Sequence, residues 1–154
     1  MTTPLDVEVL QQFRMVFRAV RTHFHEIEKK CDISGSQLWV LSCINVAGSL
    51  RVTEIAEKLS IHQSTASNLI ERMVKDGLVK KIKSSTDQRV TNIFLTEAGK
   101  AILHKAPGPA EGLLPATLKQ LSTDELRQIQ GALDMLLGKM DVDPAAKHTP
   151  LADL

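Results

Sequence analysis

Large apolar side chains form a regular stripe in the N-terminal part of the chain. From Leu10 to Cys31 they recur at alternating steps of three and four residues, which places them on one face of an α-helix. Arginines recur at helical spacing between them. The pattern therefore predicts one long amphipathic helix. Its apolar stripe consists of Leu10, Phe13, Phe17, Val20, Phe24, Ile27 and Cys31.

A second apolar stripe lies near the other end of the chain, from Leu126 to Met140. Ser122 and Glu125 stand at the spacing of a capping box, which marks the start of a helix. After Asp141 the periodicity is lost, and we expect residues 141–154 to fray.

Two arrangements would bury these two stripes. They could pack on each other within one subunit, or they could interleave with a second copy of the chain. We favour the second copy, because helices this long beside a small middle region would otherwise expose large apolar patches. The predicted dimerisation segments are residues 5–33 and 110–140. The predicted interface residues are Leu10, Phe13, Phe17, Leu126, Ile129, Leu133 and Leu136.

The middle of the chain, residues 34–106, reads as helix, turn, helix and hairpin. Ser34 and Gln37 form a capping box for a helix that ends at Gly48, and Thr53 is the predicted cap of a short helix over 54–59. A helix over 63–76 ends at Gly77. Strands over 78–83 and 90–95 flank a polar tip. We predict a mainly α fold with a small β wing, in which a winged helix-turn-helix lobe joins a helical dimerisation lobe in one domain over 1–154.

The helix over 63–76 carries small hydrogen-bonding side chains on its outer face, which can approach the edges of DNA bases closely. Residues 53–106 hold nine basic and six acidic side chains, although the whole chain has a net charge of only +1. A solvated polar helix beside a basic hairpin is the alternative, and we favour DNA binding. The candidate DNA-binding residues are Gln63, Ser64, Thr65, Ser67, Asn68, Arg72, Lys75, Lys83, Asp87 and Arg89.

Three stretches resemble the MarR family of bacterial transcriptional regulators, named for multiple antibiotic resistance. They are the run from Arg51 through Val79, the wing triplet Asp87-Gln88-Arg89, and residues 95–99, Leu-Thr-Glu-Ala-Gly. The similarity covers about residues 10–140. It implies a homodimer that binds a nearly palindromic operator in double-stranded DNA, usually as a repressor. It also implies that Arg89 reaches the minor groove while Asp87 holds it by a charge-assisted hydrogen bond.

The sequence departs from the family pattern in two places. His62 stands where a short capping side chain is usual, so we expect a poorly capped helix start. Pro107, Pro109 and Pro115 interrupt the long fifth helix of the family, and we expect a bent linker there because proline removes a helical hydrogen bond.

The resemblance also implies release of DNA by a small anionic aromatic compound bound between the dimerisation helices and the DNA-binding lobe. The candidate ligand residues are Met15, Arg18, Arg21 and Trp39, with an arginine pairing with a carboxylate and Trp39 as an apolar wall. The arginines are equally consistent with a solvated helix face.

Other functions have little support in the sequence. The spacings of the five histidines predict no metal site, and no phosphate-binding loop or nucleophile motif is present, so we expect neither an enzyme nor a cofactor. No stretch predicts a signal peptide or a membrane span, and we expect a cytoplasmic protein. Two alternatives stay open: a repressor switched by oxidation of Cys31, and a winged-helix module that binds protein instead of DNA.

Overall fold

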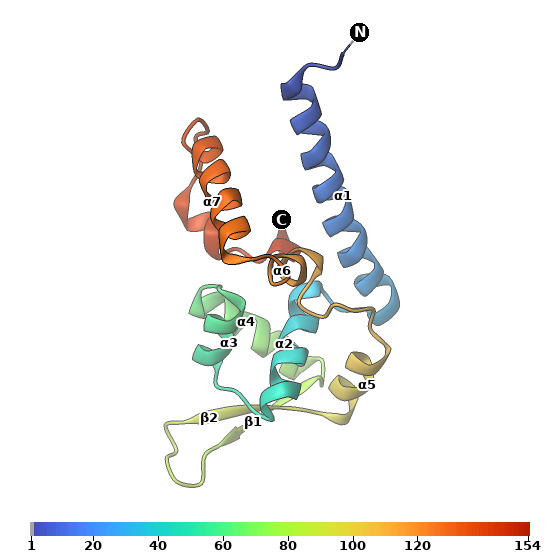
Figure 1. Ribbon diagram of the computed structural model, residues 1–154. Coiled ribbons are helices and arrows are strands. Elements are labelled where there is room, and N and C mark those ends of the chain that lie inside the picture. Colours follow the sequence, from blue (N-terminus) through green and yellow to red (C-terminus); the bar gives the residue numbers. More distant parts are fainter. Residues whose placement is uncertain (1) are drawn as a thin grey trace.

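The computed structural model describes residues 2–154 and consists of a winged helix-turn-helix with two helical arms (Figure 1). The first arm is helix α1 (Leu5–Cys31), and the second is α7 (Thr123–Leu137). Between them lie α2 (Gly35–Ala47), α3 (Val52–Leu59), α4 (Gln63–Lys75), β1 (Val79–Lys83), β2 (Thr91–Leu95), α5 (Glu97–Lys105) and α6 (Leu113–Leu118). The predicted fold class, mainly helical with a two-stranded wing, is confirmed.

A single apolar core lies beneath the helix-turn-helix. Helix α2 runs through its centre and buries Leu38, Leu41 and Ile44 completely. Ile70 of α4 and Ile93 of β2 close the core from either side. Because α2 is apolar on most of its circumference, it is the central helix against which the other elements pack.

The predicted helix caps at Ser34 and Ser122 are confirmed, and the one at Thr53 is wrong. Ser34 and Ser122 each accept a hydrogen bond from the backbone N–H three residues later, and Thr96 caps α5 in the same way. The predicted cap at Thr53 is displaced to Arg51, because the Glu54 carboxylate accepts from the Arg51 backbone N–H at 3.0 Å. That hydrogen bond, with a second from the Arg51 guanidinium, lowers the pKa of Glu54.

The two strands of the wing pair antiparallel, with Val79 opposite Leu95 and Lys83 opposite Thr91. The turn before α3 extends this sheet. Leu50 and Ile93 exchange backbone hydrogen bonds of 3.2 and 2.7 Å, which adds a short bridge beside β2. The hairpin is therefore anchored to the helix-turn-helix at its base.

The proline-rich linker interrupts the fifth helix, as the sequence predicts. Helix α5 ends at Lys105, and α6 begins at Leu113 after an irregular turn that contains a cis bond at Gly108–Pro109. Pro115 lies in the first turn of α6, where a backbone N–H has no intrahelical partner to lose. The expected interruption of the fifth helix is thus observed, and two separate helices, α5 and α6, take its place.

The predicted fraying of residues 141–154 is wrong in this structure. Two short 3-10 helices, η1 (Pro144–His148) and η2 (Leu151–Asp153), bring the chain back against α2. The Asp143 side chain caps η1 by accepting from the Ala145 N–H at 3.0 Å. The C-terminus consequently lies near the middle of the molecule (Figure 1).

Gly99 provides a test of packing at the base of the wing. A Cβ at this position would lie 2.2 Å from the Leu78 carbonyl oxygen, which accepts a hydrogen bond from the Thr96 N–H. We expect Gly99→Ala to lower the free energy of unfolding by about 1–3 kcal/mol through overpacking. Urea denaturation at fixed protein concentration measures this.

The matched control is Gly131→Ala in α7, where a Cβ meets nothing within 4 Å. It should be neutral, or stabilising by up to about 1 kcal/mol through helix propensity. Equal stability of the Gly99→Ala and wild-type proteins would show that the Leu78 carbonyl yields without cost.

Candidate nucleic-acid interface

Helix α4 presents a polar face because its other face is held in the core. Ala66, Ile70 and Met73 are buried, and Leu69 is half-buried beside them. This fixes the rotation of the helix, so that Gln63 and Asn68 face outward. Four other predicted contact residues of α4 are exposed as well: Ser64, Ser67, Arg72 and Lys75. Thr65 is half-buried.

The start of α4 is as poorly capped as the sequence predicts. His62 precedes the helix with extended backbone angles and makes no side-chain hydrogen bond to it. No acidic residue occupies the first turn. The free N–H groups and the positive end of the helix dipole thus face outward, an arrangement that favours a phosphate group.

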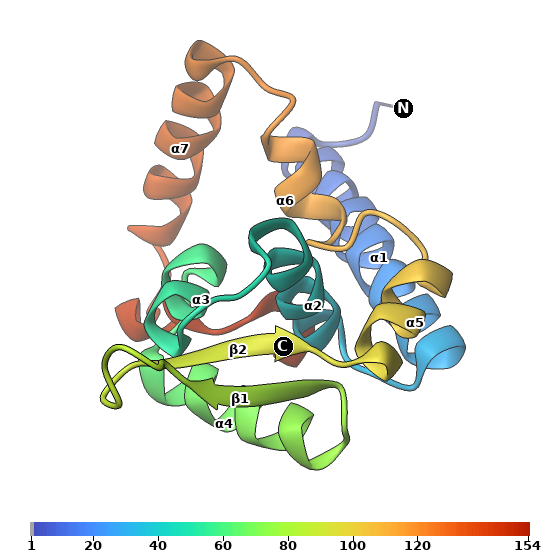
Figure 2. The same cartoon turned by 90° about the horizontal axis from the view of Figure 1, so that it is seen from below.

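An ion pair joins helix α4 to the wing. Lys81 on β1 contacts the Glu71 carboxylate on α4. The pair neutralises Lys81 and leaves Arg72, Lys75 and Lys83 as cations on this side of the molecule. Seen from below, α4 lies beside the two strands, so the helix and the wing belong to one surface (Figure 2).

The wing tip holds its arginine in the predicted way. Asp87 accepts from the backbone N–H of Arg89 at 3.0 Å and from its Nε at 3.3 Å. The Arg89 side chain is nevertheless 92% exposed. One carboxylate therefore orients the guanidinium while most of it stays open to a partner.

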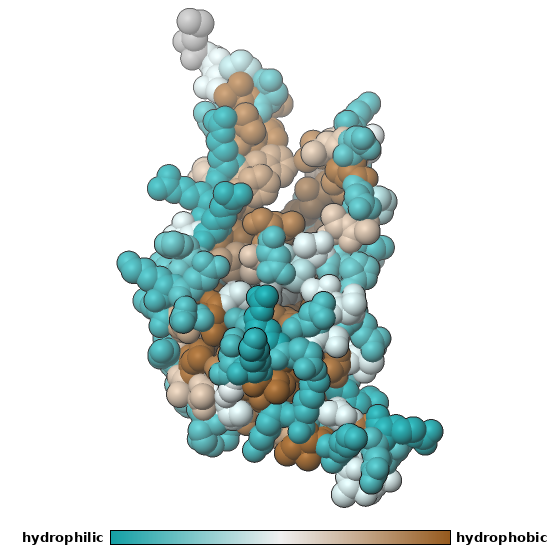
Figure 3. Space-filling view, turned by 180° about the vertical axis from the view of Figure 1, so that it is seen from behind, coloured by the Kyte–Doolittle hydropathy of each residue, from teal (hydrophilic) through white to brown (hydrophobic). Residues whose placement is uncertain are grey.

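The predicted dimerisation residues lie on open faces of the two arms. Phe17 is 63% exposed, and its ring lies tilted by 46° against that of Phe13, with centroids 6.2 Å apart. No residue of α7, Thr123–Leu137, is buried. In the space-filling view from behind, apolar side chains gather on both arms across an open gap (Figure 3). The large apolar side chains exposed there include Leu10, Phe17, Leu126, Ile129, Leu133 and Leu136.

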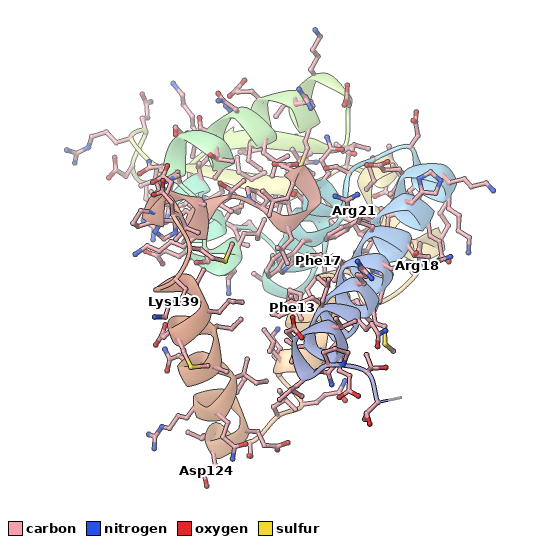
Figure 4. The ribbon with its side chains drawn as sticks, turned by 90° about the horizontal axis from the view of Figure 1, so that it is seen from above. Phe13, Phe17, Arg18, Arg21, Asp124 and Lys139 are labelled. Atoms are coloured by element: carbon pink, nitrogen blue, oxygen red, sulfur yellow. The ribbon has the colours of Figure 1, made fainter. Side chains whose placement is uncertain are left out.

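The four predicted ligand residues do not converge. Arg21 lines a cavity of about 740 Å³ between α1 and the C-terminal segment, and Trp39 lines a neighbouring cavity of about 450 Å³. Arg18 and Met15 line neither, and Met15 is 72% exposed. At 100° per residue, position 15 falls almost opposite the Phe17 side of α1, whereas Arg21 lies one turn along it. Figure 4 shows Phe13, Phe17 and Arg21 on the inner side of α1.

The remaining candidate chemistry has structural explanations. Cys31 is 4% exposed, so its sulfur is shielded from solvent, and burial raises the pKa of the Cys43 thiol, which disfavours its reactive thiolate form. His23 is buried and hydrogen-bonds the Pro109 carbonyl at 3.0 Å, which ties α1 to the proline turn. Among residues 2–154, no group of three potential metal ligands lies together.

Sequence reasoning missed one contact beside this surface. The ring of His148, from the C-terminal segment, meets the edge of His62 at a centroid distance of 4.9 Å, directly before α4. Two histidines far apart in an irregular region give no periodic signal that could reveal such a contact. Within the described residues 2–154, no helix is long and apolar enough to cross a membrane.

Comparison with known proteins places this surface in a family. The MarR family model matches residues 33–91, which span α2 to the start of β2. An uncharacterised HTH-type transcriptional regulator of Bacillus subtilis, YfiV, is 34% identical over 107 residues, covering 70% of this chain and 67% of its own.

Solved structures share the fold. A MepR-like protein complexed with pseudoligands superposes with a TM-score of 0.60 at 21% identity, over 88% of this chain and 94% of its own. A mutant MarR from E. coli complexed with operator DNA gives a TM-score of 0.56 at 23% identity, over 88% and 99%. With a matching family model, a relative above 30% identity and the winged helix itself, the chain belongs to the MarR family of transcriptional regulators.

Proposed function

We propose that this protein is a homodimeric repressor that binds a nearly palindromic operator in double-stranded DNA. The observation that carries the proposal is the joint surface of α4 and the wing, where outward-facing Asn68 and a carboxylate-held Arg89 lie on linked elements. Small side chains on α4 suit the major groove, and an extended arginine suits the narrow minor groove.

The two open arms support the dimer. Helices α1 and α7 expose apolar stripes that this single chain leaves uncovered. A second copy related by a two-fold axis would cover both stripes at once, because each arm would meet the partner's arms. The same axis would place the two α4 helices as a pair, which is what a palindromic site requires.

The ligand part of the proposal centres on Arg21. Its cavity has the volume of a small-molecule site and is lined largely by apolar side chains, including Phe17, Val20 and Phe24. A guanidinium in an apolar cavity pairs well with a carboxylate. We infer that a small aromatic carboxylate binds there and favours a dimer whose α4 helices are wrongly spaced for DNA.

Operator binding is tested by salt titration of gel-shift affinity, using the DNA upstream of the protein's own gene. For a dimer that neutralises several phosphates, we expect a log–log slope of roughly −5 to −10. Contacts should centre on grooves about 34–36 Å apart or a multiple of that. Binding to a partner protein in place of DNA would give no salt-dependent shift.

Variants of the surface separate its two parts. Arg89→Ala should weaken binding to all sequences, and Asp87→Ala should do so less, because the arginine remains. Asn68→Ala should cost about 1–3 kcal/mol at one base pair only. Arg127→Ala, on the distant arm α7, is the control. Unchanged DNA affinity in Arg89→Ala would contradict the role of the wing.

The dimer is tested by placing a charge in the proposed interface. Phe17→Asp or Leu133→Asp should dissociate or aggregate the protein, because an unpaired buried charge costs several kcal/mol. Met15→Asp, an equally exposed apolar position on the other side of α1, should leave it intact. Sedimentation velocity at micromolar concentration measures both, and a monomeric wild-type protein would refute the dimer.

The ligand is tested by calorimetry with benzoate, cinnamate and pyridine carboxylates, followed by competition with operator DNA. Arg21→Ala should weaken binding of any active compound about tenfold or more, as loss of a charged hydrogen-bonded pair does. Arg18→Ala serves as the matched control, since Arg18 lines neither cavity. An equal loss of ligand affinity in both variants would favour the alternative in which the arginines form a solvated helix face.

A further inference from the structure

The C-terminal segment lies at the junction between α1 and the DNA-binding lobe. We call residues 144–154, which include η1 and η2, the strap. It crosses the middle of the molecule below the two arms (Figures 1 and 4). It contacts α2 through η2 and reaches the turn before α4 through His148. Both of these contacts lie in the DNA-binding lobe, and the strap faces α1 across the 740 Å³ cavity, which Phe17 of α1 and Leu151 of the strap both line.

The strap separates the two junction cavities. Phe24, Leu151, Ala152 and Leu154 line both the 740 Å³ and the 450 Å³ cavity, so three of the four shared lining residues come from the strap. Arg21 lies in the first cavity and Trp39 in the second. Withdrawal of the strap would join the two cavities and place the arginine and the indole in one space.

The strap packs closely against the start of α2. Gly35 is the first residue of that helix, and a Cβ there would lie 2.4 Å from the Phe24 ring and 3.3 Å from the Ala152 side chain. Only glycine leaves room for the aromatic ring at this point. Phe24 forms a wall of both cavities, so this close approach also shapes the site on which the strap rests.

The strap is folded but lightly attached. Its turns are closed by its own hydrogen bonds, such as Ala146 N–H to Asp143 and Thr149 N–H to Ala146, both 3.0 Å. Within the described residues, the His148 Nδ1 contact to the Ser60 carbonyl at 3.3 Å is its one side-chain hydrogen bond to the rest of the protein. Leu151, its main apolar contact, is still 40% exposed. Such a segment can leave without unfolding the core.

We propose that the strap is an internal occupant of the space between the Arg21 and Trp39 cavities, which an anionic aromatic ligand must displace in order to contact both side chains. The inference rests on the proposed function for the identity of that ligand, but not for the docking of the strap. Because the strap also contacts Ser60 and His62, its departure would remove these contacts directly before the start of α4. Ligand binding would then change the surroundings of the start of α4, because these contacts would be lost.

The test uses the free, full-length protein and an aromatic anion, anilinonaphthalene sulfonate. Leu151→Ser should tighten binding of this probe about tenfold, the gain expected if the strap occupies the site in about nine molecules of ten. Trp39 is the single tryptophan, and it lines the 450 Å³ cavity together with strap residues. In the same variant the indole ring of Trp39 should be more accessible to acrylamide, so its fluorescence should be quenched more strongly.

Val142→Ser is the matched control, because Val142 is an exposed apolar residue that precedes the strap and lines neither cavity. His148→Ala tests the same docking at a surface position that does not contribute to the core, and it should shift both readouts in the same direction by less. If Leu151→Ser and His148→Ala both match Val142→Ser in probe affinity and quenching, the strap does not occupy the site.

Operator affinity of the wild-type protein separates the two proposals. Probe affinity and Trp39 quenching need no DNA, so a shift in both supports the strap even if no operator is bound. Strong operator binding with no response to Leu151→Ser and His148→Ala would overturn the strap and leave the repressor proposal standing.

Discussion

The burial of one face of α4 in the core around the central helix α2 is the constraint on which the rest of the structure depends. Ile70 and Met73 are fully buried, and a rotation of the helix by a third of a turn would expose them and bury polar side chains. The free energy of the core thus holds Asn68 and its neighbours outward. The outward polar face follows from the apolar face on the opposite side of the same helix.

This constraint explains why the DNA-binding lobe could be predicted from the sequence. Capping residues such as Ser34 and Thr96 act within three residues of themselves, and apolar periodicity acts within a helix, so both signals are local. The single error, at Thr53, has a local cause of another kind. The Glu54 carboxylate bonds the Arg51 backbone directly, and no capping side chain is needed. The contact between Asp87 and Arg89 was implied by the family resemblance, and it is also local, because only one residue separates the two.

The junction could not be predicted in the same way, because its contacts join distant parts of the chain. His148 meets a turn 88 residues away, and Ala152 rests on Gly35 at the start of α2. No periodicity links such positions. The ligand residues failed to converge for a simpler reason: helical geometry turns Met15 away from Arg21, and Arg18, although one turn from Arg21, lines neither cavity. Arginines at helical spacing were predicted to share a function, but a cavity lies on one side only.

The base of the wing has a consequence for how the two halves of the DNA-binding surface can vary. Leu50 is bonded to β2 on one side, and the Thr96 hydroxyl donates to the Gly77 carbonyl at 2.6 Å on the other. Both ends of the hairpin are thus fastened to the lobe before the tip begins. The tip over 84–90 can then gain or lose residues without moving α4, since the altered loop is closed off by its own anchored base. In the proposed complex with DNA, reach along the DNA backbone and the choice of bases are therefore separable traits, which can change one at a time.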